Sequence, residues 1–252
     1  MIIDKPRSET LPALKDLWQE AFGDSREFID TFFRTGFSPE RCRCLWKDDH
    51  LVAALYWFDC DWGKRKLAYL YAVATDKAFR NQGLCKKLME DTHRHLEALG
   101  YSGAVLVPGE PELFSFYKKL GYAPFGSGST VTILPAGNPC PLTPTEETAY
   151  QTRRGHLLPE NSVIHRAEVF PFLSAFCKFY TTENALFCLS QDGDTVYFQE
   201  FLGDPSFLPG ILVSLGASKG VVSIPGDKAP LAMYRSFTDD PTLPAYFGIP
   251  LN

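Results

Sequence analysis

The sequence predicts an α/β fold made of two lobes in tandem, the second of them degenerate. Three observations lead to this prediction. The first half alternates strand-like apolar runs with helical spacing, a proline-rich segment interrupts both patterns, and a stretch beginning at Gly220 repeats one beginning at Gly103. We therefore expect an N-terminal lobe over residues 1–137, a linker over 138–150 and a second lobe over 151–252.

The elements of the first lobe follow from periodicity and turn residues. Residues 11–33 have helical spacing that Gly23-Asp24-Ser25 interrupts, which predicts two short helices. Strands joined by tight turns are expected over 42–46, 51–58 and 66–74. A helix over 83–99 precedes a short buried strand over 104–107. Pro111 then opens a second helix that Gly121 ends, and a strand over 129–134 is expected to close the lobe.

The internal repeat supports duplication. GAVLVPGEPELFSFYKKL aligns without a gap to GVVSIPGDKAPLAMYRSF, so that Tyr117 faces Tyr234 and Glu110 faces Asp227. A hairpin, a helix and a Leu-Gly pair precede both copies, and this shared order favours duplication over chance. The second copy has only LGDPSFLPGILVSLG where the first has a long loop and a full helix. We therefore expect the second lobe to lack that loop.

Composition limits the class of protein. The 252 residues are 45% hydrophobic and 22% charged, as in ordinary globular domains. No apolar run is long enough to span a membrane and the start does not look like a signal peptide, so we expect a cytoplasmic protein that does not enter membranes. Seven cysteines without a CxxC pair predict reduced thiols and no metal site. The net charge of −5 argues against nucleic acid as a partner. The whole imbalance lies from Pro141 onward, where the acidic surface is either simply solvated or attracts a cationic amine.

One loop has the features of an anion site. In YLYAVATDKAFRNQGLCKKLME, an apolar strand runs into a polar loop and then into an amphipathic helix. The start of a helix leaves backbone N–H groups unpaired, and its dipole favours an anion there. Gly83 allows close approach of a ligand, and Arg80 can add charge-assisted hydrogen bonds. The loop lacks both GxxxxGK[ST] and GxGxxG, so we expect neither a P-loop nor a dinucleotide fold.

The loop resembles the acyl-CoA-binding signature R/Q-x-x-G-x-G/A of the GNAT superfamily of N-acetyltransferases. The neighbouring strands, the helix and the FYKKLGY segment also occur in that family's order, and the tandem arrangement resembles the two-lobe proteins related to the enhanced-intracellular-survival acetyltransferases. The resemblance implies acetyl-CoA as acyl donor, no metal, and direct attack on the thioester by a primary amine of a small molecule or peptide. It also implies that strand 66–74 splays from strand 104–107 to admit the pantetheine. The expected acetyl-CoA contacts are Val73, Ala74, Thr75, Arg80, Asn81, Gln82, Gly83, Leu84, Cys85 and Lys86.

The resemblance also implies a catalytic residue. Tyr117, in FSFYKKLGY, stands where the family places a tyrosine that protonates the departing CoA thiolate. Packing on the apolar face of its helix is the alternative role. No carboxylate or histidine lies within residues 67–74 to deprotonate the amine. Water-mediated deprotonation is therefore one route, and the candidate bases are Asp59, Asp61, Glu110, Glu112 and the terminal carboxylate of Asn252.

Three questions stay open at the level of sequence. Cys85 stands where the family has glycine or alanine, and it is either a tolerated small residue or a thiol activated by the helix start. Trp18, Phe22, Phe28 and Phe32 either flank the substrate mouth, as in the family, or form ordinary core. The functional alternatives are a non-catalytic CoA-binding regulatory module and a protein lysine acetyltransferase. The sequence identifies neither the acceptor nor the oligomeric state.

Overall fold

The computed structural model describes residues 1–226 and 229–251, so Asp227 and the Asn252 carboxylate lie outside the described residues. The chain forms two compact units, each made of a long segment and a short return segment. They are Met1–Ala123 with Met233–Leu243, and Pro124–Ala232 with Pro244–Asn252. These spatial units have other bounds than the lobes expected along the chain, whose limits stay a prediction.

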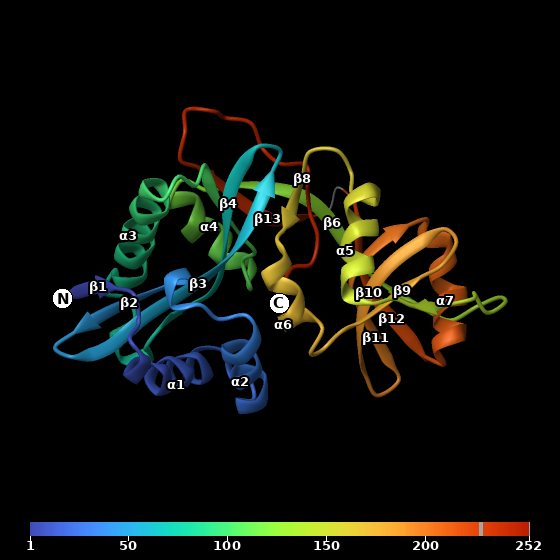
Figure 1. Ribbon diagram of the computed structural model, residues 1–252, viewed down its shortest axis with the longest axis horizontal. Coiled ribbons are helices and arrows are strands. Elements are labelled where there is room, and N and C mark those ends of the chain that lie inside the picture. The colour runs from blue at the N-terminus through green and yellow to red at the C-terminus, as the bar shows by residue number, and fades with distance from the viewer. Residues whose placement is uncertain (227–228, 252) are drawn as a thin grey trace. The chain divides into compact units, whose positions relative to one another are not determined.

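The first unit is built around a mixed sheet in the strand order β1-β2-β3-β4-β5-β13 (Figure 1). All neighbouring strands pair antiparallel except β4 and β5, which are parallel. The strands are β1 Ile2–Asp4, β2 Cys42–Lys47, β3 His50–Trp62, β4 Arg65–Thr75, β5 Gly103–Leu106 and β13 Ala229–Ser236. The helices are α1 Leu11–Phe22, α2 Arg26–Thr35, α3 Leu84–Ala98 and α4 Pro111–Lys119.

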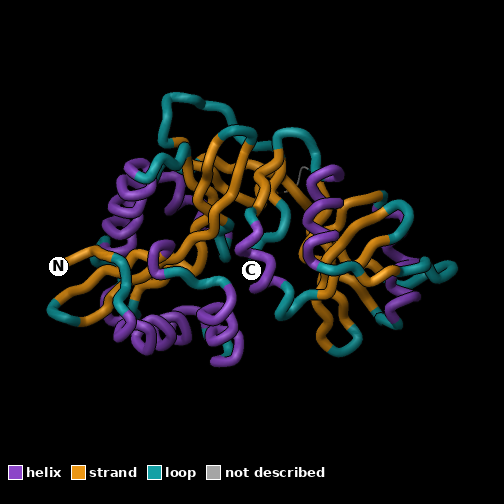
Figure 2. The backbone as a smooth tube through the Cα atoms, viewed as in Figure 1, coloured by secondary structure: helices purple, strands orange, loops and turns teal. Residues whose placement is uncertain are grey.

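Helices cover both faces of this sheet (Figure 2). Successive side chains of a strand point to opposite faces. On β3, Trp57 therefore packs with the leucines of α3, whereas Tyr56 packs 5.3 Å from Trp18 of α1, measured between ring centroids. Because both faces are covered, β3 and β4 are continuous apolar runs rather than alternating ones.

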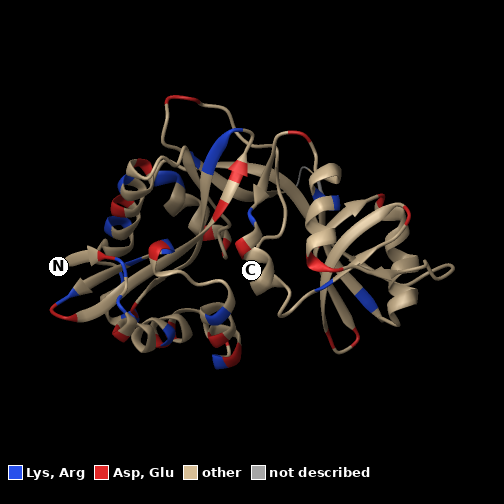
Figure 3. Ribbon diagram, viewed as in Figure 1, with Lys and Arg blue, Asp and Glu red and all other residues tan. Residues whose placement is uncertain are grey.

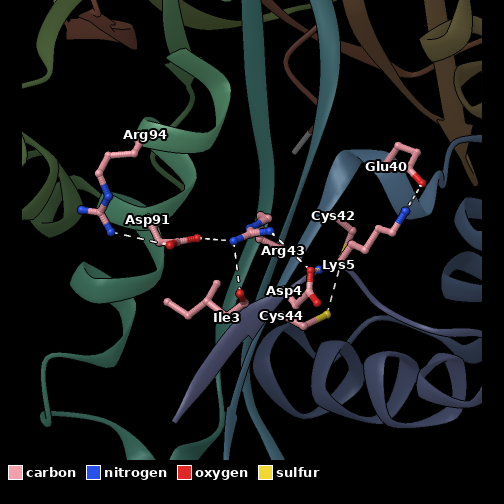
Figure 4. A network of polar contacts seen from close by, with 9 residues as sticks. All are labelled: Ile3, Asp4, Lys5, Glu40, Cys42, Arg43, Cys44, Asp91 and Arg94. Atoms are coloured by element: carbon pink, nitrogen blue, oxygen red, sulfur yellow. Dashed lines mark hydrogen bonds and ion pairs between the residues drawn. The ribbon is translucent and has the colours of Figure 1, made fainter. Parts of the chain in front are cut away.

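A polar network connects strands β1 and β2 with α3 (Figure 4). Arg43 of β2 donates from Nη2 to Asp91 Oδ1 on α3 at 2.5 Å and to the Ile3 carbonyl oxygen on β1 at 3.2 Å. The Arg43 side chain is only 11% exposed, so its ion pair is shielded from solvent. The Lys5–Glu40 pair in the same view is exposed on both sides and contributes little to stability.

Strands of the second unit pair in the order β6-β12-β11-β10-β9-β7, and β8 pairs with β14. Its strands are β6 Ala123–Ile133, β7 Thr143–Pro144, β8 Ser162–His165, β9 Lys178–Thr181, β10 Ala185–Asp192, β11 Thr195–Gly203, β12 Lys219–Pro225 and β14 Tyr246–Phe247. Its helices are α5 Glu147–Leu157, α6 Phe170–Leu173 and α7 Leu208–Leu215. The short α7 connects the parallel strands β11 and β12, as α3 connects β4 and β5.

Most of the predicted elements are confirmed within one to four residues at each end, including the two short helices and the shortened helix of the second copy. The expected role of residues 129–134 is wrong. They do form a strand, but it pairs antiparallel with β12 of the second unit, from Gly220↔Ile133 to Pro225↔Gly128. The position next to β5 is taken instead by β13, with Tyr234 opposite Val105.

The repeat holds for only half of its length. Gly103 and Gly220 both begin parallel strands that follow a helix. Beyond Pro108 and Pro225 the copies diverge, because Tyr117 lies on helix α4 and Tyr234 on strand β13. The predicted match between these two tyrosines is therefore wrong, and Tyr234 packs edge-on against Trp62 with ring centroids 5.5 Å apart.

Among the described residues, no helix combines the length and the apolar character needed to cross a bilayer.

Candidate active site

The site begins at an irregularity in β4. Ala54 pairs with Ala74 and Tyr56 pairs with Tyr71, so two residues of β4, Ala72 and Val73, lie opposite Leu55 alone. This is a β-bulge, and Ala72 has a φ of +47°, which is uncommon for a residue other than glycine. A bulge changes the direction of its strand and interrupts regular pairing.

The bulged end of β4 separates from β5. The parallel pairing runs only from Leu67↔Gly103 to Tyr69↔Val105, although β4 continues to Thr75. This is the splay that the resemblance implies. Within residues 1–226 and 229–251, backbone groups of β4 beyond Tyr69 therefore pair with no strand on the β5 side, and they can bind an extended ligand as an added strand would.

The loop after the bulge leads into α3 through two left-handed residues, Asn81 with a φ of +61° and Gly83 with a φ of +73°. Gly83 is the N-cap of α3, and the first helical hydrogen bond runs from the Lys87 N–H to its carbonyl at 3.0 Å. The N–H groups of residues 84–86 therefore have no helical acceptor. A Cβ placed on Gly83 would have no atom within 4 Å, so the space beside it is open.

Charge in the same loop is strongly positive. Residues 76–87 contain the cations Lys77, Arg80, Lys86 and Lys87 but only one acid, Asp76, in a chain with a net charge of −5. Arg80 donates from Nε to the Thr75 carbonyl oxygen at 3.1 Å, which leaves its two Nη groups available. Open space, free amides and a held guanidinium together fit a diphosphate group. Sequence reasoning missed Lys77 and Lys87, although the local excess of lysine was visible.

Cys85 is not activated. Its side chain packs against the apolar core between the sheet and α3, and burial raises the pKa of the thiol to about 11, against a weaker opposing hydrogen bond from Thr75. Of the two roles left open for Cys85, burial therefore favours the tolerated small residue over the thiol activated by the helix start, because loss of hydration outweighs the helix dipole. Cys85 is a small, half-buried core residue.

Tyr117 lies on the inner face of α4 and is 7% exposed. Its ring contacts Phe116 and Tyr122, with centroids 5.2 and 5.8 Å away, and belongs to the same core cluster as Leu84 and Leu88 of α3. Burial, with a smaller contribution from Cys85, raises the pKa of Tyr117 above its ordinary value, so the phenol stays protonated at neutral pH. Among the described residues its hydroxyl makes no hydrogen bond, and it can therefore donate to a ligand.

The candidate bases are dispersed. Asp59 accepts a hydrogen bond from the Tyr101 hydroxyl at 2.5 Å and lies 4.0 Å from Lys66 Nζ. Asp61 is half-buried near the far end of β3, and Glu110 and Glu112 are exposed at the start of α4. None of these four is paired in the sheet with the bulge residues. In the part of the chain that the structure describes, no group of three potential metal ligands exists.

The aromatic residues of α1 and α2 form one cluster with those of the sheet. Trp18 and Phe32 are buried, at 2% and 1% exposure, and pack 4.7 Å apart between ring centroids. Phe28 is half-buried and Phe22 is 47% exposed. The cluster thus extends from the core to the surface. It also includes a residue that sequence reasoning missed, Asp24, whose Oδ2 accepts a hydrogen bond from Trp18 Nε1 at 2.7 Å.

Comparison with known proteins identifies the domain. Residues 3–125 match the family model for the acetyltransferase (GNAT) domain. A GCN5-related N-acetyltransferase from Anabaena variabilis has a similar fold, with a TM-score of 0.71 and 16% identity over 93% of this chain and 72% of that one. A GCN5-related N-acetyltransferase from Kribbella flavida has a TM-score of 0.68 and 13% identity over 93% of this chain and 70% of that one. Eis1 from Mycobacterium abscessus has a TM-score of 0.67 and 10% identity over 94% of this chain and 74% of that one.

No curated protein matches the chain by sequence. The structural likenesses extend over both units, and the family match covers the segment that holds the bulge, the cationic loop and α4. Residues 3–125 thus belong to the GNAT acetyltransferase family, and the chain as a whole has the fold of the GCN5-related N-acetyltransferases.

Proposed function

We propose that the first lobe binds acetyl-CoA and transfers its acetyl group to a primary amine. The observation that carries this proposal is the continuity of one segment, residues 66–87. It contains the splayed strand end, the bulge at Ala72 and the cationic helix start at Gly83 in direct succession. The splayed strand end can pair with an amide-containing arm of a long ligand, and the cationic helix start can bind its diphosphate.

The loop residues would hold the diphosphate. The N–H groups of residues 84–86 point out of the start of α3, and the Nη groups of Arg80 add charge-assisted hydrogen bonds. Gly83 supplies a left-handed φ without a side chain that would occupy the site. Asn81, Gln82 and Lys86 are neighbours of Gly83 along the chain and are further candidates to contact the diphosphate, and Gln82 is itself anchored by its Nε2 donating to the Ala78 carbonyl oxygen at 3.4 Å.

The bulge residues would act on the thioester that acetyl-CoA supplies when bound. Backbone amides near Val73, Ala74 and Thr75 are candidates to donate to the pantetheine and to the carbonyl oxygen of the thioester. A fixed N–H aimed at that oxygen stabilises negative charge as the amine adds to the carbonyl carbon. Because β4 is held by β3 on its other edge, these amides need little rearrangement.

Tyr117 is the candidate general acid. A buried phenol that stays protonated at neutral pH can deliver its proton to a departing thiolate. Cys85 is unsuited to form an acyl-enzyme, because burial keeps its thiol protonated and therefore weakly nucleophilic. Direct attack by the amine fits both observations. The amine would lose its proton to water or to one of the candidate carboxylates.

The cellular setting proposed for this activity is the cytoplasm. All seven cysteines are free thiols, and five of them are buried. Free thiols persist in a reducing compartment.

Calorimetry with CoA tests the proposed site. Arg80→Ala is expected to weaken CoA binding by about 1.5–3 kcal/mol, which is typical of a charge-assisted hydrogen bond. Arg94→Ala is the matched control, since it removes an exposed guanidinium from the other end of α3 and is expected to leave CoA affinity unchanged. Equal affinities of Arg80→Ala and the wild type would assign the loop another role.

Activity assays separate the alternatives. Amine-dependent release of CoA thiol from acetyl-CoA supports a transferase. Tight CoA binding without release across a panel of small amines and lysine peptides would indicate a non-catalytic CoA-binding module. Release with lysine peptides alone, with the acetyl group located by mass spectrometry, would indicate a protein lysine acetyltransferase.

A further inference from the structure

A cavity of about 470 Å³ lies between the second half of α3 and the return segment Met233–Leu243. Its volume is in the range usual for small-molecule sites. All residues proposed above for acetyl transfer, except the Asn252 carboxylate, are described, and none of them lines the cavity. The cavity is therefore distinct from the candidate active site.

The floor of the cavity, which is its buried and half-buried lining, carries a cation without a counterion. Arg235 is half-buried and donates from Nη1 to the Leu120 carbonyl oxygen, which holds the guanidinium in place. Among the described residues, no carboxylate lies within 4 Å of this guanidinium. Its remaining N–H groups can therefore bind an anionic group with charge-assisted hydrogen bonds.

The same floor holds a histidine with an unsatisfied nitrogen. His93 is 3% exposed, and its Nε2 shares a hydrogen bond of 2.8 Å with the Tyr122 hydroxyl. Its Nδ1 is buried and has no hydrogen-bond partner in the described part of the chain, which costs free energy. Arg235 contributes to lowering the pKa of His93, after the larger effect of burial, so the two side chains lie close together. A polar ligand at the floor can serve both.

The exposed rim of the cavity carries the opposite charge. Helix α3 contains both acidic and basic residues (Figure 3). Glu97 of α3 and Asp239 of the return segment are exposed, and no lysine or arginine nitrogen of the described residues lies within 4 Å of either. Glu90 and Arg94 also line the cavity, but each is paired with another residue of α3, at 3.8 and 3.6 Å. The charges left unpaired are therefore one cation at the floor and two acids at the rim.

We propose that this cavity binds a free α-amino acid. The carboxylate of the ligand lies at Arg235 and its ammonium group faces Glu97 and Asp239. A ligand with only a negative charge would meet the acids of the rim, and one with only a positive charge would meet the guanidinium, so the cavity discriminates against both. Phe237 is half-buried with its ring centroid 5.5 Å from that of His93, and it offers apolar surface to an uncharged side chain.

Calorimetry on the intact chain, without acetyl-CoA, tests the proposal. The probes are L-alanine, L-leucine and L-phenylalanine, whose uncharged side chains increase in size. Each has two matched analogues. Propanoate, 4-methylpentanoate and 3-phenylpropanoate lack the ammonium group, and ethylamine, 3-methylbutylamine and 2-phenylethylamine lack the carboxylate. At least one amino acid is expected to bind saturably and at least about three-fold more tightly than either of its analogues, since the rim pairs are solvent-exposed.

Variants locate the binding in the cavity. Arg235→Gln is expected to weaken amino acid binding about ten-fold or more, as for loss of a charge-assisted hydrogen bond. Glu97→Gln/Asp239→Asn removes both unpaired acids and is expected to abolish the preference for the amino acid over the analogue without the ammonium group. Glu27→Gln is the matched control, because it removes an exposed carboxylate from the first turn of α2 and leaves the preference unchanged.

Three results would overturn the proposal. They are the absence of binding by all three amino acids, equal binding of an amino acid and its analogue without the ammonium group, and equal behaviour of the double variant and Glu27→Gln. Circular dichroism checks that each variant is folded, and if Arg235→Gln is not, the double variant decides, since both of its side chains are exposed. No acetyl-CoA is present, so the result does not depend on the proposed acetyl transfer.

Discussion

The ion pair between Arg154 of α5 and Glu200 of β11 is deeply buried in the second unit, and it supports a quantitative prediction. Their side chains are 3% and 0% exposed. Glu200 Oε2 accepts from Arg154 Nε at 2.6 Å and from the Tyr150 hydroxyl at 2.9 Å, and Oε1 accepts from Arg154 Nη2 at 2.9 Å and from the Tyr246 hydroxyl at 3.2 Å. Each carboxylate oxygen thus has two donors.

Glu200→Gln removes the countercharge and leaves the guanidinium buried. Breaking a buried pair in this way costs about 3–5 kcal/mol of the free energy of unfolding, because the remaining charge has neither water nor a partner. Tyr246→Phe removes only one of the four donors to the carboxylate and is expected to cost about 1.5 kcal/mol, the lower end for a hydrogen bond to a charged group, because its distance of 3.2 Å is the longest of the four. The double variant Arg154→Met/Glu200→Leu leaves no charge behind and is expected to recover most of the loss.

Urea unfolding followed with two probes tests this reasoning. All four tryptophans lie at or before Trp62, so their fluorescence reports on the first unit, whereas far-UV circular dichroism reports on both. Glu200→Gln should shift the circular dichroism transition more than the fluorescence transition. A loss below about 1 kcal/mol, or one equal to that of Tyr246→Phe, would show that the buried charge is not held as the geometry indicates.

Three further predictions concern the first lobe and the response to pH. Tyr117→Phe should lower kcat by at least about 100-fold without changing CoA affinity, as expected for loss of a general acid, and an unchanged kcat would leave Tyr117 a packing residue. Gly83→Ala should cost about 1 kcal/mol of stability because of its φ of +73°, and should weaken CoA binding measured by calorimetry because the new Cβ points into open space beside the proposed diphosphate. Burial, reinforced by nearby arginines, lowers the pKa of His93 to about 3 and that of His165 to about 4. The unfolded chain binds these protons near pH 6.5 and the folded chain does not, so stability is full above that pH and falls between pH 6.5 and about 4. Thermal melts at pH 7 and 5 should differ by about 2 kcal/mol for each histidine, and this loss should shrink in His93→Gln.

The order of elements in the first lobe was predictable because it depends on local patterns. Three local features each require a particular backbone conformation wherever they occur. They are Gly23 between two helical runs, the apolar run that ends at Ala74, and the glycine at position 83. The cationic loop could be assigned to an anion for the same reason, since the free amides of a helix start and a neighbouring arginine are local properties.

Pairing between distant segments was not predictable. Residues 129–134 form a strand as expected, but they pair with β12, and β13 takes the place beside β5. The choice among strands of similar apolar character depends on packing in three dimensions, which periodicity does not record. The same limit explains why Tyr234, aligned with Tyr117, lies on a strand rather than on a helix.

The sequence by itself determined the class of fold and the order strand, cationic loop and helix, and it predicted an anion site in that loop and a catalytic role for Tyr117, because these follow from residue type and spacing over short stretches. Only the tertiary structure decided that the Cys85 thiol is half-buried with a raised pKa, that β4 bulges at Ala72 and leaves β5, and that Asp24 accepts a hydrogen bond from Trp18. Hydration, strand register and charge pairing depend on neighbours brought together from distant parts of the chain, and those neighbours exist only in the folded protein.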